Sequence, residues 1–363
     1  MVNEAVAQPQ QQSAQVTGEP PSRPAREHRY DVDLMRLLCS CAVMLGHVGA
    51  TFIAATDGQP DNGSGAYWVG HVAEGFNAFA VPMYFAIAGW AVLVGAPPAD
   101  GARMWRRVVR NTVPLFVWTA LYLVWAWVRD RNEEPMTRLG VDALFGSVRP
   151  AYHLWFMYSY IPIIVMLAFA VLVRAGQRPW RLGAALLAVA LAPQVLGTLG
   201  ELTGWHVPEV GWGFGTYAVV YAVGGALLFG LPERMPRRVR LALPLVWLGA
   251  VAGCVWYDTQ IHYVIANAHV FVAAMTVAVL LMVHRLPIPV RLRPTLAKLA
   301  NAALGAYLVH VFFVEELVRR MVSPDLSAPL AALVLVVGLS LTMVLSYAAS
   351  LAWGALKLRR YLG

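Results

Sequence analysis

Apolar residues gather into ten long segments that short polar gaps separate. The segments lie near residues 34–55, 72–95, 112–128, 152–173, 182–199, 213–230, 240–257, 264–283, 298–318 and 328–356. A helix of about 20 apolar residues crosses the ~30 Å hydrocarbon core of a bilayer, and most of these segments approach that length. The pattern therefore predicts an all-α polytopic membrane protein with about ten transmembrane helices.

The composition agrees with this fold class. The chain is 59% hydrophobic and 13% charged, whereas charged residues make up about 25% of a typical soluble domain. Residues 1–28 are rich in Gln, Ala, Pro and Ser and contain no apolar run, so we expect a disordered cytoplasmic tail. Residues 29–363 are expected to form a single transmembrane domain. The cysteines have no metal or disulfide spacing and are typical of buried apolar positions: Cys39, Cys41 and Cys254.

The distribution of positive charge predicts the orientation. Of the 28 Lys and Arg residues, 21 lie at the two ends of the chain and in alternate gaps, six lie in the other gaps, and one, Arg36, lies inside the first segment. Cytoplasmic loops carry the excess of Lys and Arg, so both termini are predicted to be cytoplasmic, in the inner (plasma) membrane. The net charge of +8 therefore indicates topology and not a nucleic-acid partner.

The first segment carries a file of polar residues on one helix face. Arg36 and His47 are eleven residues apart, so an α-helix places them within ~20° of one stripe, and Asp33 lies ~60° from Arg36. Arg36 would lie near the cytoplasmic face and His47 near the midplane, where ionisable groups are costly and typical of function. The alternative is that Arg36 only anchors the helix and His47 only bonds a neighbouring helix.

Other polar residues acquire a depth from the predicted topology. His310 lies twelve residues beyond Lys298 and is expected near the midplane, with Tyr307 on a nearby helix face. Four further residues are expected toward the outer side, where each alone is typical of an interfacial anchor: Glu74, Asn77, His153 and Trp155. Together these positions indicate a water-accessible cavity that crosses the membrane.

Four motifs in order carry a resemblance to a known family. They are Val32-Asp-Leu-Met-Arg36 with His47; Val81-Pro-Met-Tyr-Phe-Ala-Ile-Ala-Gly89 followed by Arg106, Arg107, Arg110 and Pro114; His153-Leu-Trp-Phe156; and Leu304-Gly-Ala-Tyr307-Leu-Val-His310. This set resembles the acyltransferase-3 family of integral-membrane enzymes, and within it the bacterial surface-polysaccharide O-acetyltransferases. One departure is Ala88-Gly89 where the family usually has Ser-Gly, so a serine nucleophile at that position is excluded here.

The resemblance implies roles for these residues in acyl transfer. A neutral imidazole can take a proton from a hydroxyl, so His47 is the candidate base. Arg36, oriented by Asp33, and the basic residues Arg106, Arg107 and Arg110 would bind the phosphates of cytoplasmic acyl-CoA. Tyr307 and His310 would contact the acceptor or the oxyanion, or only pack, and the outer residues Glu74, Asn77, His153 and Trp155 would bind the acceptor.

The predicted function is a membrane O-acetyltransferase that uses acetyl-CoA as co-substrate, with no permanently bound cofactor and no metal. The acceptor would be a hydroxyl of a cell-envelope glycan or its lipid-linked precursor. One alternative acceptor is a secreted small molecule such as a macrolide. A transporter or flippase with the same polar cavity is the alternative of another class, but no internal repeat is visible and the motif order favours the enzyme. A non-catalytic scaffold would not need the Arg36 and His47 pair.

The predicted topology can be tested with single cysteines in intact cells. Cysteines at positions 132 and 204 should react with a membrane-impermeant thiol reagent, because both gaps are predicted to lie outside. A cysteine at position 100 should be protected, because the gap after the second segment is predicted to be cytoplasmic. Labelling at position 100 but not at 132 or 204 would contradict the orientation.

Overall fold

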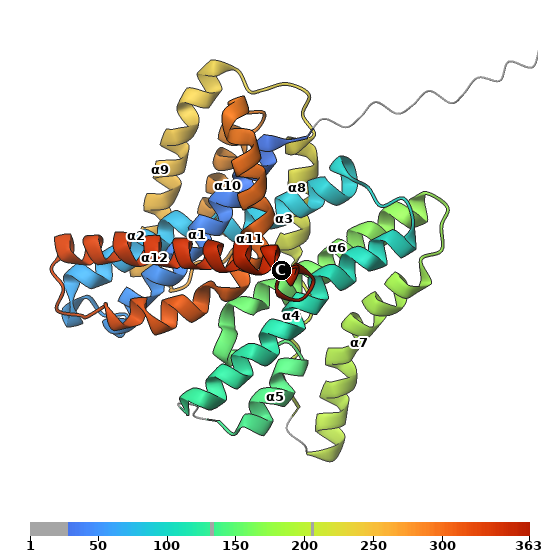
Figure 1. Cartoon of the computed structure of the whole chain (residues 1–363), viewed down its shortest axis with the longest axis horizontal. Coiled ribbons are helices and arrows are strands. Elements are labelled where there is room, and N and C mark those ends of the chain that lie inside the picture. Colours follow the sequence, from blue (N-terminus) through green and yellow to red (C-terminus); the bar gives the residue numbers. More distant parts are fainter. Residues whose placement is uncertain (1–27, 131–133, 205–206) are drawn as a thin grey trace, which may run out of the picture.

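The computed structural model describes residues 28–130, 134–204 and 207–363, and within these ranges it contains helices and no strand (Figure 1). The predicted tail, residues 1–28, lies outside the described residues except for His28. The α-helices of the described ranges are α1 Tyr30–Ala55, α2 Ser64–Asn77, α3 Ala80–Trp90, α4 Gly101–Arg129, α5 Met136–Leu144, α6 Trp155–Arg174, α7 Trp180–Thr203, α8 Thr216–Phe229, α9 Arg237–Gln260, α10 Val270–Val283, α11 Arg293–Glu316, α12 Ala328–Ala355 and α13 Arg359–Leu362.

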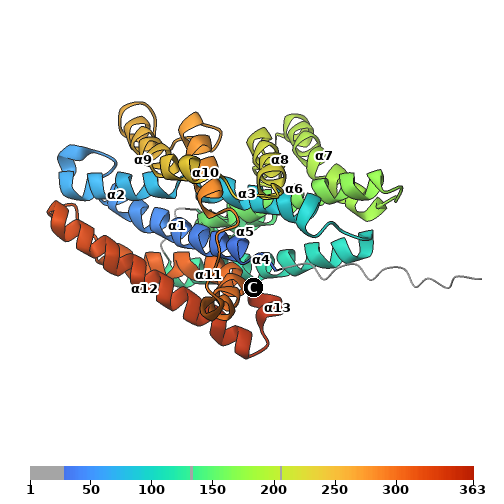
Figure 2. The same cartoon turned by 90° about the horizontal axis from the view of Figure 1, so that it is seen from above.

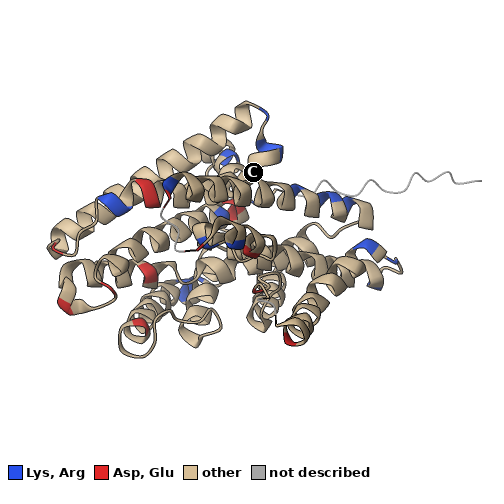
Figure 3. Cartoon of the chain, turned by 90° about the horizontal axis from the view of Figure 1, so that it is seen from below, with Lys and Arg blue, Asp and Glu red and all other residues tan. Residues whose placement is uncertain are grey.

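The membrane-spanning character of the fold is confirmed. Eight helical stretches in the described ranges are long and apolar enough to cross a membrane, and α8 and α10 are apolar helices of 14 residues each. These ten stretches coincide with the ten predicted segments. In Figure 3 most of the Lys and Arg segments lie from the centre to the right end of the view, and Asp and Glu segments lie mostly at the left end and along the lower edge. The assignment of these ends to the cytoplasm and the outside stays a prediction.

Several segments differ locally from the prediction. The helices expected over 112–128 and 264–283 begin at Gly101 and Val270, and two other segments are interrupted or preceded by turns. The segment expected over 72–95 begins at Ser64 and consists of α2, α3 and a π-helical turn over Ala91–Gly95, with a short break between Asn77 and Ala80. The segment expected over 152–173 begins with a 3-10 turn, Arg149–Leu154, before α6. A local polar residue explains where α4 begins: the Asp100 carboxylate accepts a hydrogen bond from the backbone N–H of Arg103 and caps the helix.

Helix α1 lies in the middle of the bundle. Figure 2 shows α9, α10, α8 and α7 on one side of a middle row formed by α2, α1, α3 and α6, with α12, α11, α13 and α4 on the other side. The apolar side chains of Met35, Met44, Val48 and Phe52 on α1 are fully buried. This central place lets α1 present its polar file to cavities inside the bundle.

Helices α3 and α8 approach so closely that their contact requires glycine. A Cβ atom at Gly89 would lie 1.9 Å from the carbonyl oxygen of Ala222, and one at Gly225 would lie 2.1 Å from the carbonyl oxygen of Ala86. The glycine of the Ala88-Gly89 pair therefore serves helix packing. The side chain of Ala88, by contrast, lines a cavity.

We expect Gly89→Ala to destabilise the protein, because its methyl group would force α3 away from α8 at a cost of about 1–3 kcal/mol. The thermal unfolding midpoint of the detergent-purified protein should fall. Gly224→Ala is the matched control, since a Cβ atom there meets nothing within 4 Å. Equal midpoints for the two variants would contradict the close contact.

Candidate functional site

Three imidazole rings meet in the interior of the bundle. His47 comes from α1, His153 from the 3-10 turn before α6, and His310 from α11. The ring centroids of His47 and His310 lie 5.1 Å apart, and those of His153 and His310 lie 5.0 Å apart. We expected His153 at an outer rim, but its exposed fraction is only 1%. The difference arises because the turn packs against α4 and α11 and carries the ring inward.

Backbone carbonyl groups of α11 orient two of these rings. Nδ1 of His310 lies 2.5 Å from the carbonyl oxygen of Tyr307, and Nε2 of His153 lies 3.3 Å from that of Leu308. A carbonyl oxygen only accepts, so each of these ring nitrogens carries the hydrogen in the neutral imidazole. The other nitrogens, Nε2 of His310 and Nδ1 of His153, are therefore proton acceptors. Both are buried and have no partner among the described residues.

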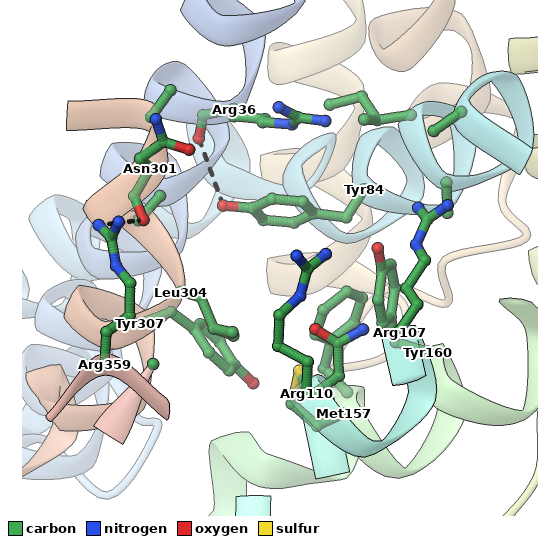
Figure 4. Close-up of a pocket in the computed structure, with 18 residues that line it drawn as sticks. Arg36, Tyr84, Arg107, Arg110, Met157, Tyr160, Asn301, Leu304, Tyr307 and Arg359 are labelled. Carbon is green, nitrogen blue, oxygen red and sulfur yellow. Dashed lines mark hydrogen bonds between the residues drawn. The ribbon is translucent and has the colours of Figure 1, made fainter. Parts of the chain in front are cut away.

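One cavity approaches the histidines from the N-terminal end of α1. It has a volume of about 360 Å³, and Tyr307 forms part of its wall. Its described lining includes the last residue, Gly363, and no Asp or Glu, so the charged side chains that face it are guanidinium groups. Figure 4 shows these groups reaching the cavity from α1, α4 and α13: Arg36, Arg107, Arg110 and Arg359. We call this space the inner cavity.

The predicted contact between Asp33 and Arg36 is present. Nη1 of Arg36 donates to Oδ1 of Asp33 over 3.2 Å, and Nε2 of His28 lies 2.6 Å from Oδ2 of the same carboxylate. The hydroxyl of Tyr84 donates to the carbonyl oxygen of Arg36 over 3.3 Å. Asp33 therefore restrains the guanidinium group while the Tyr84 side chain fixes the backbone at this point.

The basic start of α4 divides between the cavity and the surface. Arg107 and Arg110 are three residues apart and share the face that lines the inner cavity. Arg106 is exposed and does not belong to the described lining, because the side chain before Arg107 lies ~100° around the helix. The structure thus brings two of the three predicted arginines of this helix to the cavity.

A second cavity approaches the histidines from the C-terminal end of α1. It has a volume of about 490 Å³ and includes His47 in its wall. Its other polar groups are hydroxyl and charged side chains: Thr51, Asp57, Tyr152, Tyr263, Glu315 and Arg319. Nη1 of Arg319 donates to Oε2 of Glu315 over 2.9 Å. We call this space the outer cavity, after the predicted topology.

None of the four predicted acceptor-binding residues belongs to the described lining of the outer cavity: Glu74, Asn77, His153 and Trp155. The Tyr263 hydroxyl donates to Oε1 of Glu74 over 3.1 Å, and burial raises the pKa of Tyr263, which keeps this donor protonated. Asn77 packs against α1 beside His47, where a Cβ atom at Gly46 would lie 2.2 Å from its Nδ2 atom. The Trp155 side chain is 41% exposed and is absent from the described lining of both cavities.

Several cavity residues were not predicted. In the inner cavity these are Tyr84, Asn301 and Arg359, and in the outer cavity Tyr152, Tyr263, Glu315 and Arg319. Tyr152 directly precedes the His153 motif, and Glu315 follows His310 by five residues, so both were close to predicted positions. Arg359 belongs to the basic C-terminal end of the chain, and no local pattern indicates that the chain after α12 folds back onto α4.

The comparison with known families identifies the class of protein. The model of the acyltransferase-3 family, described as an acyltransferase domain, matches residues 29–351. The protein is thus a multi-pass membrane acyltransferase, which is the class that the sequence predicted. It belongs to the acyltransferase-3 family. No curated protein and no solved structure matches the chain significantly.

We expect His310→Ala to reduce acyl transfer about 100-fold or more, because it removes a buried, oriented proton acceptor beside His47. Its stability should fall by about 2–5 kcal/mol, because removal of the fully buried ring leaves a cavity. Turnover is normalised to folded protein and compared with His262→Ala, an exposed histidine of the loop before α10. A well-folded His310→Ala protein with full turnover would reduce His310 to a packing residue.

Proposed function

We propose that this protein transfers an acetyl or other short acyl group from cytoplasmic acyl-CoA to a hydroxyl group of a cell-envelope glycan or its precursor. One observation carries the proposal: two cavities reach the histidines from opposite ends of α1. Tyr307 lines the inner cavity and His47 lines the outer cavity. The His310 ring lies between them, 5.6 Å from the ring of Tyr307 and 5.1 Å from that of His47.

The inner cavity suits the acyl donor. Guanidinium groups remain charged and bind phosphate oxygens through two parallel hydrogen bonds, and Arg107 and Arg110 have no carboxylate partner within the described residues. Beyond the arginines the wall becomes apolar, with Ala88, Met157 and Leu304. A phosphorylated carrier with an extended arm matches this order, because its charged part would stay at the mouth while its thioester reached the histidines.

The reaction follows from this placement. The acceptor hydroxyl oxygen attacks the carbonyl carbon of the thioester while His47 takes the hydroxyl proton. The C–S bond then breaks, and the departing thiolate takes this proton from His47. The products are an ester and free CoA. His310 presents Nε2 as an acceptor near His47 and can hold the proton during the exchange. The histidine that begins neutral is thus neutral again after each turnover.

The outer cavity suits a hydroxylated acceptor. Sugar hydroxyls donate and accept hydrogen bonds. In this cavity the carboxylates of Asp57 and Glu315 can accept them, and the hydroxyls of Tyr152 and Tyr263 can donate and accept them. Its volume of about 490 Å³ falls in the range of ~300–1,000 Å³ that holds small ligands. A sugar unit of a glycan in the inner membrane fits this chemistry, and a secreted small molecule with a free hydroxyl is the second candidate.

Two variants test the mechanism. His47→Ala should lower turnover roughly 10²- to 10⁴-fold, because positioned base catalysis is lost, while folding changes little. Arg36→Lys keeps the positive charge that insertion requires but loses the planar fork, so it should insert normally and bind acyl-CoA more weakly. The measurement is release of free CoA thiol from acetyl-CoA by purified protein, with and without a cell-envelope glycan extract.

Arg103→Lys is the control for the charged substitution, since Arg103 pairs with Asp100 at the exposed start of α4. Near-normal turnover in His47→Ala would refute His47 as the base. If the wild-type protein neither binds nor consumes acetyl-CoA, yet moves a labelled glycan across proteoliposomes, the transporter interpretation replaces the enzyme.

A further inference from the structure

A further cavity opens beside the inner cavity at the same end of α1. It has a volume of about 480 Å³ and is bounded by the start of α1, the end of α3, the end of α8 and the loop after α10. Arg36 lines both cavities, so the two spaces adjoin at its side chain. We call this space the head cavity. Of its described lining, only Arg36 and its partner Asp33 have a role in the function proposed above.

Asp31 organises one wall of the head cavity. Its carboxylate accepts hydrogen bonds from Nε and Nη2 of Arg29 over 2.8 and 2.7 Å. It also accepts from the backbone N–H of Arg285 over 2.6 Å. Behind this wall, burial and the nearby Arg29 lower the pKa of His284, which favours its neutral form. A buried carboxylate thus ties the start of α1 to the loop after α10 and fixes Arg29 in place.

An aromatic residue forms another wall. Trp90 ends α3, and the guanidinium carbon of Arg29 lies 5.5 Å from the centroid of its ring. The π-helical turn Ala91–Gly95 that follows closes over the indole, and a Cβ atom at Gly95 would lie 2.8 Å from that ring. Such π-helical turns are frequent at functional sites. The turn holds Trp90 at the cavity next to a fixed positive charge.

The charge of the head cavity favours an anion. Arg29, Arg36 and Arg285 line it. Asp31 pairs with Arg29 and Asp33 pairs with Arg36, so Arg285 is the one of the three without a carboxylate partner among the described residues. The Asp33 carboxylate is already engaged by Arg36 and His28. Guanidinium groups beside an indole ring are suited to a phosphorylated aromatic ligand, because they bind phosphate oxygens while the indole contacts a base.

The size of the inner cavity gives an independent reason to seek a second compartment. Its volume of about 360 Å³ lies near the lower end of the ~300–1,000 Å³ that hold drug-sized ligands. Coenzyme A is larger than such a ligand and consists of a pantetheine arm joined to a phosphorylated adenosine. The inner cavity matches the arm, which leaves the nucleotide to be placed elsewhere.

We propose that the head cavity binds the phosphorylated adenosine of the acyl donor, between Trp90 and the arginines Arg29 and Arg285, while the pantetheine arm passes Arg36 into the inner cavity. This inference rests on the proposed use of acyl-CoA. It adds a nucleotide subsite made by residues of α1, α3 and the loop after α10, apart from the arginines of α4.

The test compares whole and truncated donors with the full-length, detergent-purified protein. Titration calorimetry measures binding of coenzyme A and of 4′-phosphopantetheine, which lacks the adenosine. Trp90→Leu and Arg285→Gln should each weaken coenzyme A about tenfold or more and leave 4′-phosphopantetheine unchanged. Arg110→Gln should weaken both ligands, because it lies at the inner cavity. Arg291→Gln, an exposed neighbour outside the lining of the head cavity, should change neither.

The outcomes separate this inference from the proposed function. If Trp90→Leu and Arg285→Gln bind coenzyme A as the wild type does, or weaken both ligands equally, the head cavity is not the nucleotide subsite, although acyl-CoA remains the donor. Adenosine 3′,5′-bisphosphate should compete with coenzyme A, and binding without competition would indicate a site for a free nucleotide and overturn the inference. Failure of the wild type to bind either donor refutes the proposed function itself. Arg285 is exposed, so Arg285→Gln should fold normally and still test the nucleotide subsite if Trp90→Leu misfolds.

Discussion

The contact between Tyr122 of α4 and the backbone of α11 is the constraint on which the histidine cluster depends. The Tyr122 hydroxyl donates to the carbonyl oxygen of Leu308 and accepts from the N–H of Phe312, two groups that pair with each other in a regular α-helix. The same carbonyl oxygen lies within reach of the His153 ring. Tyr122 thereby joins α4, α11 and the turn before α6 at one point, and the orientation of His153 follows from it.

The central helix α1 connects chemistry at its two ends through simple geometry. Arg36 and His47 share one stripe, so a single rigid element holds an anion-binding group and an imidazole at a fixed separation. Packing of large, fully buried apolar side chains keeps this element in register along its length, and the polar contacts of Asp31 and of the Arg36 carbonyl add to it near its start. The polar residues from Asp33 to His47 thus lie on a helix whose position is determined by the helices packed around it.

The spacing of apolar and polar residues was sufficient to predict most of the fold. The ten apolar segments, the stripe from Asp33 to His47 and the face shared by Tyr307 and His310 all follow from local spacing, and the structure contains them. The position of His153 could not be predicted, because it depends on a 3-10 turn that folds inward and on contacts with residues more than 150 positions away. Arg359 reaches the inner cavity only because α13 turns back after α12, and Tyr263 reaches the outer one from a loop. Long-range packing of this kind leaves no local pattern.

The two cavities also thin the insulating part of the protein. In the predicted orientation, polar space enters from both ends of α1, so most of a transmembrane voltage would fall across the short layer that contains His47, His310 and Tyr307. Moving one elementary charge through such a layer is coupled to the membrane potential by ~2.3 kcal/mol per 100 mV, whereas an uncharged group crosses without electrical work. Chemistry that carries only a neutral fragment past these rings would therefore proceed equally well in energised and de-energised membranes.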